Sequence, residues 1–168
     1  MSPSILAISF FFHLVATVVW IGGLLVLTVM VWPEARRVMG ESPALEAFMA
    51  RLRKRFMPLT HLSLAVLTAT GLTQMTANAH YEGTLTFTNT WTQVILLKHL
   101  AVGGMLLGGL ALQLWVLPAL ERASLLVERG KGDPQEWRRL RQREIRLTWL
   151  NLILGILVLG FTAWATAL

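Results

Sequence analysis

The sequence predicts an all-α integral membrane protein, a four-helix up-down bundle forming one transmembrane domain over residues 1–168. Hydrophobic residues make up 55% of the chain and charged residues only 14%, with a mean hydropathy of +0.59. This apolar content exceeds what one small soluble core can bury, so lipid is the expected partner of the surface. The chain contains no Cys, which excludes disulfides and thiolate metal sites.

Four uncharged stretches predict the membrane spans. Lys, Arg, Asp and Glu are absent from Ser2 to Pro33, Met57 to Tyr81, His99 to Leu120 and Leu147 to Leu168. A helix needs about 20 residues to cross the hydrocarbon core, so we expect spans near residues 4–32, 57–79, 92–118 and 147–168. The first stretch has no basic leader and is about twice as long as the apolar region of a signal peptide, so it is expected to stay in the membrane.

The segments 33–56 and 121–146 carry the positive charge. They hold six and eight of the 15 Lys and Arg residues, and the connector between spans two and three has none. By the positive-inside rule both segments face the cytoplasm, which places the N- and C-termini on the outer side of the cytoplasmic (inner) membrane. The charge therefore indicates topology and contact with anionic headgroups. No base-reading feature accompanies it, so we expect no nucleic-acid partner.

Both basic segments are expected to be helical. Ser42-Pro43 is typical of an N-cap followed by proline at the first helical position, and it begins an amphipathic helix that we expect to end at Pro58. Asp133-Pro134 has the same form and predicts a helix that continues unbroken into the fourth span. The residues Gly130 to Gly132 are the expected flexible break before it.

The chain also contains an internal repeat, which predicts a duplicated helical hairpin. Spans one and three share a histidine, a glycine pair and a proline: His13, Gly22-Gly23 and Pro33 in one, and His99, Gly108-Gly109 and Pro118 in the other. Spans two and four share a Leu-Thr-x-Leu-x-Leu pattern at residues 59–64 and 147–152. Spans one and three should therefore run in the same direction, related by an axis along the membrane normal.

This repeat places His13 and His99 at equivalent positions. In an up-down bundle the first and third helices face each other across the centre. At 1.5 Å per residue, the two histidines lie about 13 Å and about 11 Å below the outer ends of their spans. Two imidazoles from opposed helices are the axial ligands of a six-coordinate haem iron, so we expect His13 and His99 to bind haem b. The alternative is that each histidine only forms an interhelical hydrogen bond.

Several neighbours of the two histidines fit a porphyrin. Thr17 and Gly103 each follow a histidine by four residues and leave room beside the backbone, and Trp20 lines the face of His13. The glycines equally fit close helix packing. Lys98, the one formal charge within a span, could pair with a haem propionate or extend to the outer headgroups.

His61 has no partner at its own level, because its equivalent in the repeat is Trp149. It could ligate a second, five-coordinate haem, bind a quinone, relay a proton or only form a hydrogen bond. His80 and Met75, near the outer connector, form at most a weak copper site because a third soft ligand is missing.

The sequence resembles the CopD/HemJ group of small membrane proteins, which includes the copper-resistance CopD domain and HemJ-type protoporphyrinogen IX oxidase. The likeness rests on the patterns His13-(x6)-Trp20-Ile21-Gly22-Gly23-Leu24, Arg55-Phe56 opening a span that ends near Gly71-Leu72, and Trp91-(x6)-Lys98. It implies a four-helix haem-binding protein in which His13 and Lys98 are essential for the HemJ branch, and copper handling at the outer face for the CopD branch. The chain departs from both patterns in two places. His99 follows the lysine directly, and an Asn-Glu-x-Pro-like signature is absent from the fourth span, where only Asn151 occurs.

The expected function is electron transfer through one bis-histidine haem b, with quinol or a partner respiratory complex as redox partner. Filled axial positions block inner-sphere chemistry, which favours an electron carrier over an open catalytic site. The alternatives are a HemJ-like protoporphyrinogen IX oxidase, a CopD-like copper transport or resistance protein with copper as the metal, and an accessory subunit whose histidines are structural. The sequence leaves open whether the chain is a membrane oxidoreductase and whether it forms a homo-oligomer.

Overall fold

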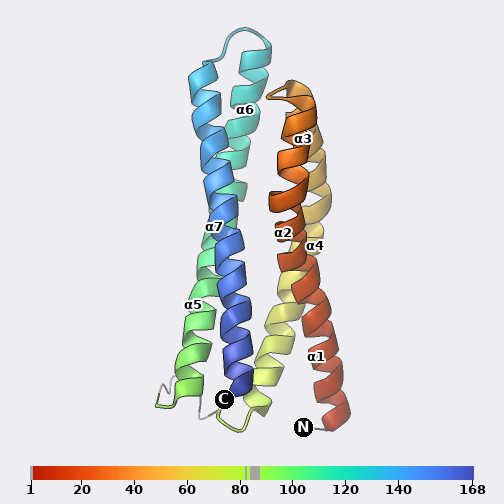
Figure 1. The fold of residues 1–168 in the computed structure, drawn as a ribbon, viewed down its shortest axis with the longest axis vertical. Helices are drawn as coiled ribbons and strands as arrows, with labels where there is room; N and C mark the ends of the chain where they lie inside the picture. The colour runs from red at the N-terminus through yellow and green to blue at the C-terminus, as the bar shows by residue number, and fades with distance from the viewer. Residues whose placement is uncertain (1, 82, 84–87) are drawn as a thin grey trace. The chain divides into compact units, whose positions relative to one another are not determined.

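The computed structural model describes residues 2–81, 83 and 88–168, and the described residues contain helices and no strand (Figure 1). Four continuous helical stretches are long and apolar enough to cross a membrane: Pro3–Met39, Ala44–Ala77, Thr90–Glu128 and Pro134–Ala167. The predicted all-α fold class is confirmed, and each predicted span falls on one of these four stretches.

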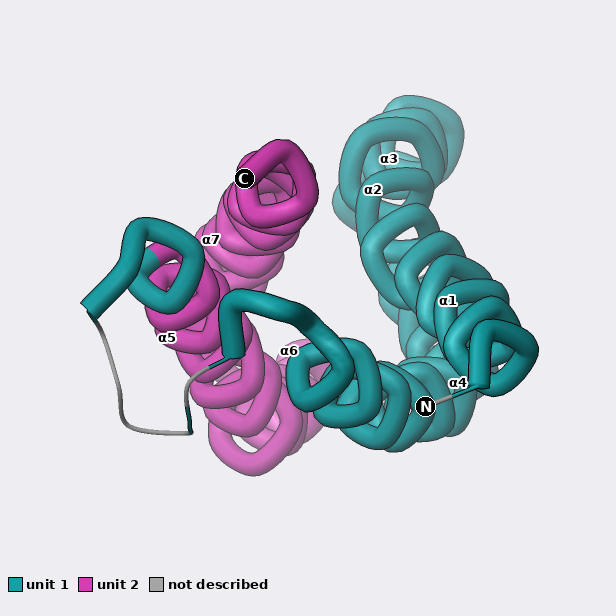
Figure 2. Tube along the Cα trace, turned by 90° about the horizontal axis from the view of Figure 1, so that it is seen from below, with its two compact units in different colours: residues 1–93 teal, residues 94–168 magenta. Residues whose placement is uncertain are grey.

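The chain divides into two compact units, Met1–Gln93 and Val94–Leu168 (Figure 2). In unit 1 the helical stretch that begins with α1 (Pro3–Thr17) packs along α4 (Pro43–Ala77). Unit 2 takes in most of α5 (Thr90–Ala111), together with α6 (Leu117–Glu128) and α7 (Pro134–Ala167). Each unit therefore holds one antiparallel helical hairpin, as the internal repeat predicts.

The predicted helix starts are confirmed by their caps. The Ser42 hydroxyl accepts a hydrogen bond from the Leu45 N–H at 3.3 Å, and the Asp133 carboxylate accepts one from the Gln135 N–H at 2.8 Å. The expected break before α7 is an ordered turn. Gly130 has φ +67°, and the N–H groups of Gly130 and Lys131 donate to carbonyls of the last turn of α6 at 3.0 Å and 2.9 Å.

The expected helix end at Pro58 is wrong, because α4 continues through this proline to Ala77. A proline removes one backbone hydrogen bond, here the donor that would reach the Lys54 carbonyl. Lys54 is exposed at the charged end of the helix, where water or headgroups can satisfy its carbonyl. Beyond Pro58 the chain is apolar, and a helix is the conformation that satisfies the backbone of such a segment in lipid.

The first and third spans contain π-helical segments just before their prolines. In span one η2 (Val26–Val31) precedes α3 (Trp32–Met39), which contains Pro33, and in span three η3 (Leu112–Val116) precedes Pro118 in α6. A proline ring clashes with the carbonyl four residues earlier, and a wider turn relieves that clash. The same backbone feature at the same place in both copies supports the duplication.

Span one has a second π-helix, η1 (Val18–Gly22), which is followed by α2 (Gly23–Leu25) and has no equivalent in α5. His99 follows His13 by 86 residues, whereas Pro118 follows Pro33 by 85, so the first copy holds one additional residue. A π-turn accommodates an additional residue without ending the helix. We assign the additional residue to η1, directly after the turn that carries His13.

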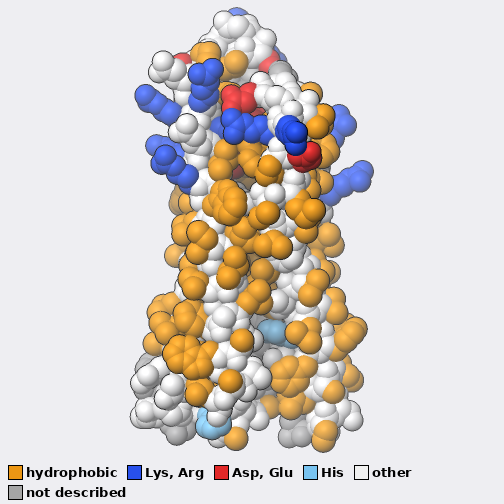
Figure 3. Space-filling model, in the orientation of Figure 1, with side chains coloured by type: hydrophobic (Ala, Val, Ile, Leu, Met, Phe, Trp, Pro, Cys, Tyr) orange, Lys and Arg blue, Asp and Glu red, His pale blue; other side chains and the backbone are white. Residues whose placement is uncertain are grey.

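The surface agrees with a membrane protein. In Figure 3 the Lys and Arg side chains gather near the turns of the two hairpins, while hydrophobic side chains cover the remaining lengths of the helices. Many large apolar side chains are exposed, among them Val18 at 70% and Leu107 at 71%. Such faces are stable when lipid covers them, so the protein is a multi-pass membrane protein.

Candidate functional site

The imidazole of His13 lies between α1 and α4 and is half-buried. Its Nδ1 is 2.8 Å from the hydroxyl Oγ1 of Thr70, and that hydroxyl in turn lies 2.6 Å from the carbonyl oxygen of Val66. A hydroxyl has one proton to donate, and the Val66 carbonyl can only accept it. Thr70 therefore accepts from His13, which places the imidazole proton on Nδ1 and the lone pair on Nε2.

Further polar side chains of α1 and α4 surround this pair. The Ser9 hydroxyl donates to the Thr70 carbonyl at 3.3 Å, and the Gln74 amide donates to the Ser9 hydroxyl at 3.4 Å. A Cβ added at Gly71 would lie 3.6 Å from Cε1 of His13, so this glycine lets the imidazole approach α4 closely. We call Ser9, His13, Thr70 and Gln74 the His13 cluster.

Thr17 and Trp20, which were predicted to line the same site, both follow His13 in span one. The Thr17 hydroxyl donates to the His13 carbonyl at 2.8 Å, so it is satisfied by its own helix and leaves a small, half-buried side chain. Trp20 is half-buried within η1. That these two residues contact a cofactor stays a prediction.

His99 has the same protonation pattern as His13. Its Nδ1 lies 2.7 Å from the Ile95 carbonyl oxygen, which can only accept, so Nδ1 carries the proton and Nε2 the lone pair. His99 comes nine residues after the start of α5 and His13 ten residues after the start of α1, which is about 14 Å and about 15 Å along their helices. The two histidines thus match in depth within their own hairpins.

The surroundings of His99 differ from those of His13. The His99 side chain is exposed, and a Cβ added at Gly103 would meet no heavy atom of the described residues within 4 Å. Lys98 is half-buried and forms no ion pair with the residues that the structure describes. The space beside Gly103, one helical turn from His99, is therefore not filled by any described side chain.

The neighbouring glycines have a different role, in packing. A Cβ at Gly104 would lie 3.2 Å from Leu154, and one at Gly108 would lie 2.7 Å from Oδ1 of Asn151. Both contacts join α5 to α7 in unit 2. The two interpretations of the glycines thus apply to different residues, because Gly104 and Gly108 permit close helix packing while Gly103 leaves space.

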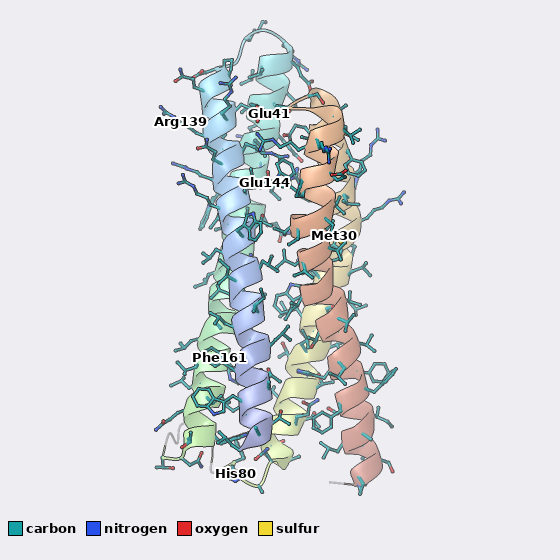
Figure 4. The ribbon with its side chains drawn as sticks, in the orientation of Figure 1. Met30, Glu41, His80, Arg139, Glu144 and Phe161 are labelled. Atoms are coloured by element: carbon teal, nitrogen blue, oxygen red, sulfur yellow. The ribbon has the colours of Figure 1, made fainter. Side chains whose placement is uncertain are left out.

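Among the residues that the structure describes, the other two histidines belong to no metal-binding cluster. His61 is exposed on α4. The Nδ1 of His80 and its backbone N–H lie 3.3 Å and 2.9 Å from Oδ1 of Asn78, and the His80 ring lies 6.4 Å from the Trp91 ring (Figure 4). Over residues 2–81, 83 and 88–168, no group of three or more His, Asp or Glu residues could hold a metal ion.

The polar partners of His13 were missed at the sequence level. Ser9 and His13 are four residues apart in one span, and Thr70 and Gln74 are four residues apart in the other. Residues at this spacing share a helix face, so two such pairs in otherwise apolar segments predict facing polar stripes. This signal was available in the sequence.

A family model described as Copper resistance protein D matches residues 50–165, more than two thirds of the chain. The chain belongs to the CopD family. The match begins in α4 and includes His61, Lys98 and His99, whereas His13, Thr17 and Trp20 precede it. No curated protein and no solved structure matches the chain. The CopD part of the predicted resemblance is thereby confirmed, and membership of the family does not itself identify the metal or cofactor.

Proposed function

We propose that this CopD-family protein binds haem b in the membrane through His13 and His99 and transfers single electrons between quinol, or a partner respiratory complex, and an acceptor. The observation that carries the proposal is that both imidazoles have the same tautomer. Each donates its Nδ1 proton to a protein oxygen and keeps a lone pair on Nε2. Histidines that ligate metals typically hold their second nitrogen in this way.

The number of ligands also favours haem. A porphyrin supplies four nitrogens of its own, so an iron held in it needs only two axial side chains. Electron-transfer copper sites use three or more protein ligands, and the described residues contain no group of three or more His, Asp or Glu residues that could supply them. Two matched histidines therefore suffice for haem and fall short for such a copper site.

Other residues fit the proposed group. Haem b would supply one-electron redox chemistry when bound. The open space at Gly103 leaves room beside His99, and Lys98 offers a cation for a propionate. Thr70 holds the His13 ring in one orientation, which lowers the cost of ordering this ligand.

The basic residues at the two hairpin turns favour one orientation of the protein in the membrane. The basic hairpin turns belong in the cytoplasm by the positive-inside rule, with both termini outside a cytoplasmic membrane. The two histidines then lie in the outer half of the bilayer, and the long side chain of Lys98, next to His99, can extend toward the outer headgroups.

The family match favours a second candidate, copper transport or resistance. In this case His13 or His99 would pass copper through the membrane, and no porphyrin would be retained. A HemJ-like protoporphyrinogen IX oxidase is the third candidate, and it requires an axial position open to substrate.

The absorption spectrum of the purified protein tests the proposal. We expect a b-type haem spectrum that carbon monoxide leaves unchanged, since both axial positions are filled. His13→Ala and His99→Ala should each lose the haem, and His61→Ala, the matched control, should keep it. A colourless preparation with stoichiometric copper would establish the second candidate, and a haem that binds carbon monoxide in the wild type would favour the oxidase.

A further inference from the structure

A second repeated motif lies where each hairpin's returning helix meets its apolar segment. The motif Arg-Leu-Arg-x-Arg occurs at residues 51–55 in α4 and at residues 139–143 in α7. The two occurrences are 88 residues apart, the same separation as that between Leu59 and Leu147 in the repeated spans. The duplication therefore extends from the spans into the basic segments.

The outer arginines of each motif share one helix face. Arg51 and Arg55 in α4 and Arg139 and Arg143 in α7 are four residues apart, and all four side chains are exposed. The middle arginine points to the other side in each copy: Arg141 is 7% exposed, and its equivalent Arg53 is half-buried. Figure 4 shows Arg139 on α7, above the buried Glu144 that pairs with Arg141. We call the four exposed residues the arginine stripes.

No described residue neutralises these side chains. The Arg36 guanidinium is paired with Glu41 and the Arg141 guanidinium with Glu144, but none of the four stripe arginines forms an ion pair or hydrogen bond with the residues that the structure describes. Each stripe thus presents two unneutralised guanidinium groups on one face.

The stripes lie at the depth of lipid headgroups. Arg55 and Arg51 precede the predicted span 57–79 by two and six residues, and Arg143 and Arg139 precede the predicted span 147–168 by four and eight. At 1.5 Å per residue these positions are about 3–12 Å outside the apolar segments. The polar layer on each side of the hydrocarbon core is about 5–8 Å thick, so the stripes cross it.

We propose that each arginine stripe binds the phosphate of an anionic phospholipid. A guanidinium forms two parallel hydrogen bonds to phosphate oxygens, and two guanidinium groups one turn apart can share one headgroup. A zwitterionic headgroup carries its own cation and would leave the positive charge of the stripe uncompensated. A soluble polyanion would have to displace the headgroups already at this depth, so lipid is the favoured partner.

The test uses the full-length protein in nanodiscs of phosphatidylcholine alone or mixed with phosphatidylglycerol. Native mass spectrometry counts the lipids that stay bound after release from the disc. The stripe variant is Arg55→Gln with Arg143→Gln. The control variant is Arg129→Gln with Lys131→Gln, which removes the same charge at the α6–α7 turn, farther from the apolar segments.

We expect the wild type and the control to retain phosphatidylglycerol over phosphatidylcholine. In the stripe variant this preference should fall about fivefold for each arginine removed, as about 1 kcal/mol per basic residue at an anionic surface implies. The proposal is wrong if the wild type shows no preference, if the stripe variant keeps it, or if both variants lose it equally. Tighter binding of a soluble oligonucleotide than of phosphatidylglycerol by the protein in phosphatidylcholine discs would also overturn it.

Discussion

The Nδ1 atom of His13 and the Oγ1 atom of Thr70 lie 2.8 Å apart, and this contact joins α1 to α4 within unit 1. Because Thr70 also donates to the Val66 carbonyl, the contact fixes both the tautomer and the direction of the imidazole. A polar contact of this kind in an apolar span orients the His13 side chain at little cost in packing. The contribution of this contact to haem binding can be measured directly.

Replacing Thr70 by Val should weaken haem binding, because the His13 ring loses the acceptor that orients it. We expect a loss of about 10–100-fold in affinity, the range found for partners of metal-bound histidines. Titration of haemin into the haem-free protein, followed by its Soret absorbance, measures the change. Thr70→Ser keeps a hydroxyl and should restore most of the affinity.

Thr68 provides the matched control for this change. Its hydroxyl donates to the Leu64 carbonyl at 2.9 Å, as that of Thr70 does to Val66, but its side chain is exposed and does not contact His13. Thr68→Val should therefore bind haemin as the wild type does. Equal affinities for Thr70→Val and Thr68→Val would remove Thr70 from the site.

Gly108→Ala should destabilise unit 2, because the new Cβ would lie 2.7 Å from the Asn151 amide oxygen. Overpacking of this kind typically costs about 1–3 kcal/mol in the free energy of unfolding. Gly109→Ala is the control, since a Cβ there meets no described heavy atom within 4 Å. Thermal unfolding in detergent, followed by circular dichroism, compares the two variants.

The double variant Gly108→Ala with Asn151→Ala locates the cause of this destabilisation. With the amide removed, the alanine at position 108 should cost less than it does in the wild type. An unchanged cost in the double variant, or a Gly109→Ala variant as unstable as Gly108→Ala, would show that this contact does not limit helix packing.

Glu144→Ala should be strongly destabilising, because its carboxylate is a partner of the buried Arg141 guanidinium. Their side chains are 10% and 8% exposed, and loss of one member of a buried ion pair typically costs about 3–5 kcal/mol. The exposed ion pair of Arg36 and Glu41, in which Nη2 and Oε1 are 2.6 Å apart, provides the comparison. Glu41→Ala should cost about 0–1 kcal/mol, as exposed pairs do.

Chemical unfolding of the two glutamate variants measures this difference. Replacing both Arg141 and Glu144 by Leu should recover much of the lost stability, since neither charge is then left buried without the other. If Glu144→Ala and Glu41→Ala unfold at the same denaturant concentration, the buried pair contributes no more to stability than the exposed pair does.

The four spans could be predicted from the sequence because charge and apolar length constrain a membrane helix directly. The uncharged stretch from Leu147 to Leu168, for example, falls on the second half of α7, which ends at Ala167. The error at Pro58 has a physical cause. Proline ends helices in water, where the freed chain can be solvated, but in lipid the following apolar residues have no conformation better than a helix.

The site was predicted only in part, because a sequence pattern identifies a residue type but not its hydrogen-bond partner. The repeat predicts His13 and His99 as candidate ligands, whereas the contact of Thr70 with His13 depends on how α1 and α4 pack. The sequence contains one additional residue between His13 and Pro33, but it does not show that a π-helix, η1, accommodates this residue. The additional residue changes which glycine of a pair packs. Gly23 lies against the Phe56 ring in span one, while Gly108, the equivalent of Gly22 in the sequence, is the packing residue in span three.

Imidazole rescue tests whether His13 and His99 bind one iron together, as we propose. His13→Gly and His99→Gly should each lose the low-spin haem absorption spectrum, and added imidazole should restore it by occupying the vacated axial position. His61→Gly should keep the spectrum without imidazole, and circular dichroism should show full helicity in all three variants. A low-spin spectrum that survives in either His13→Gly or His99→Gly without added imidazole would contradict the account.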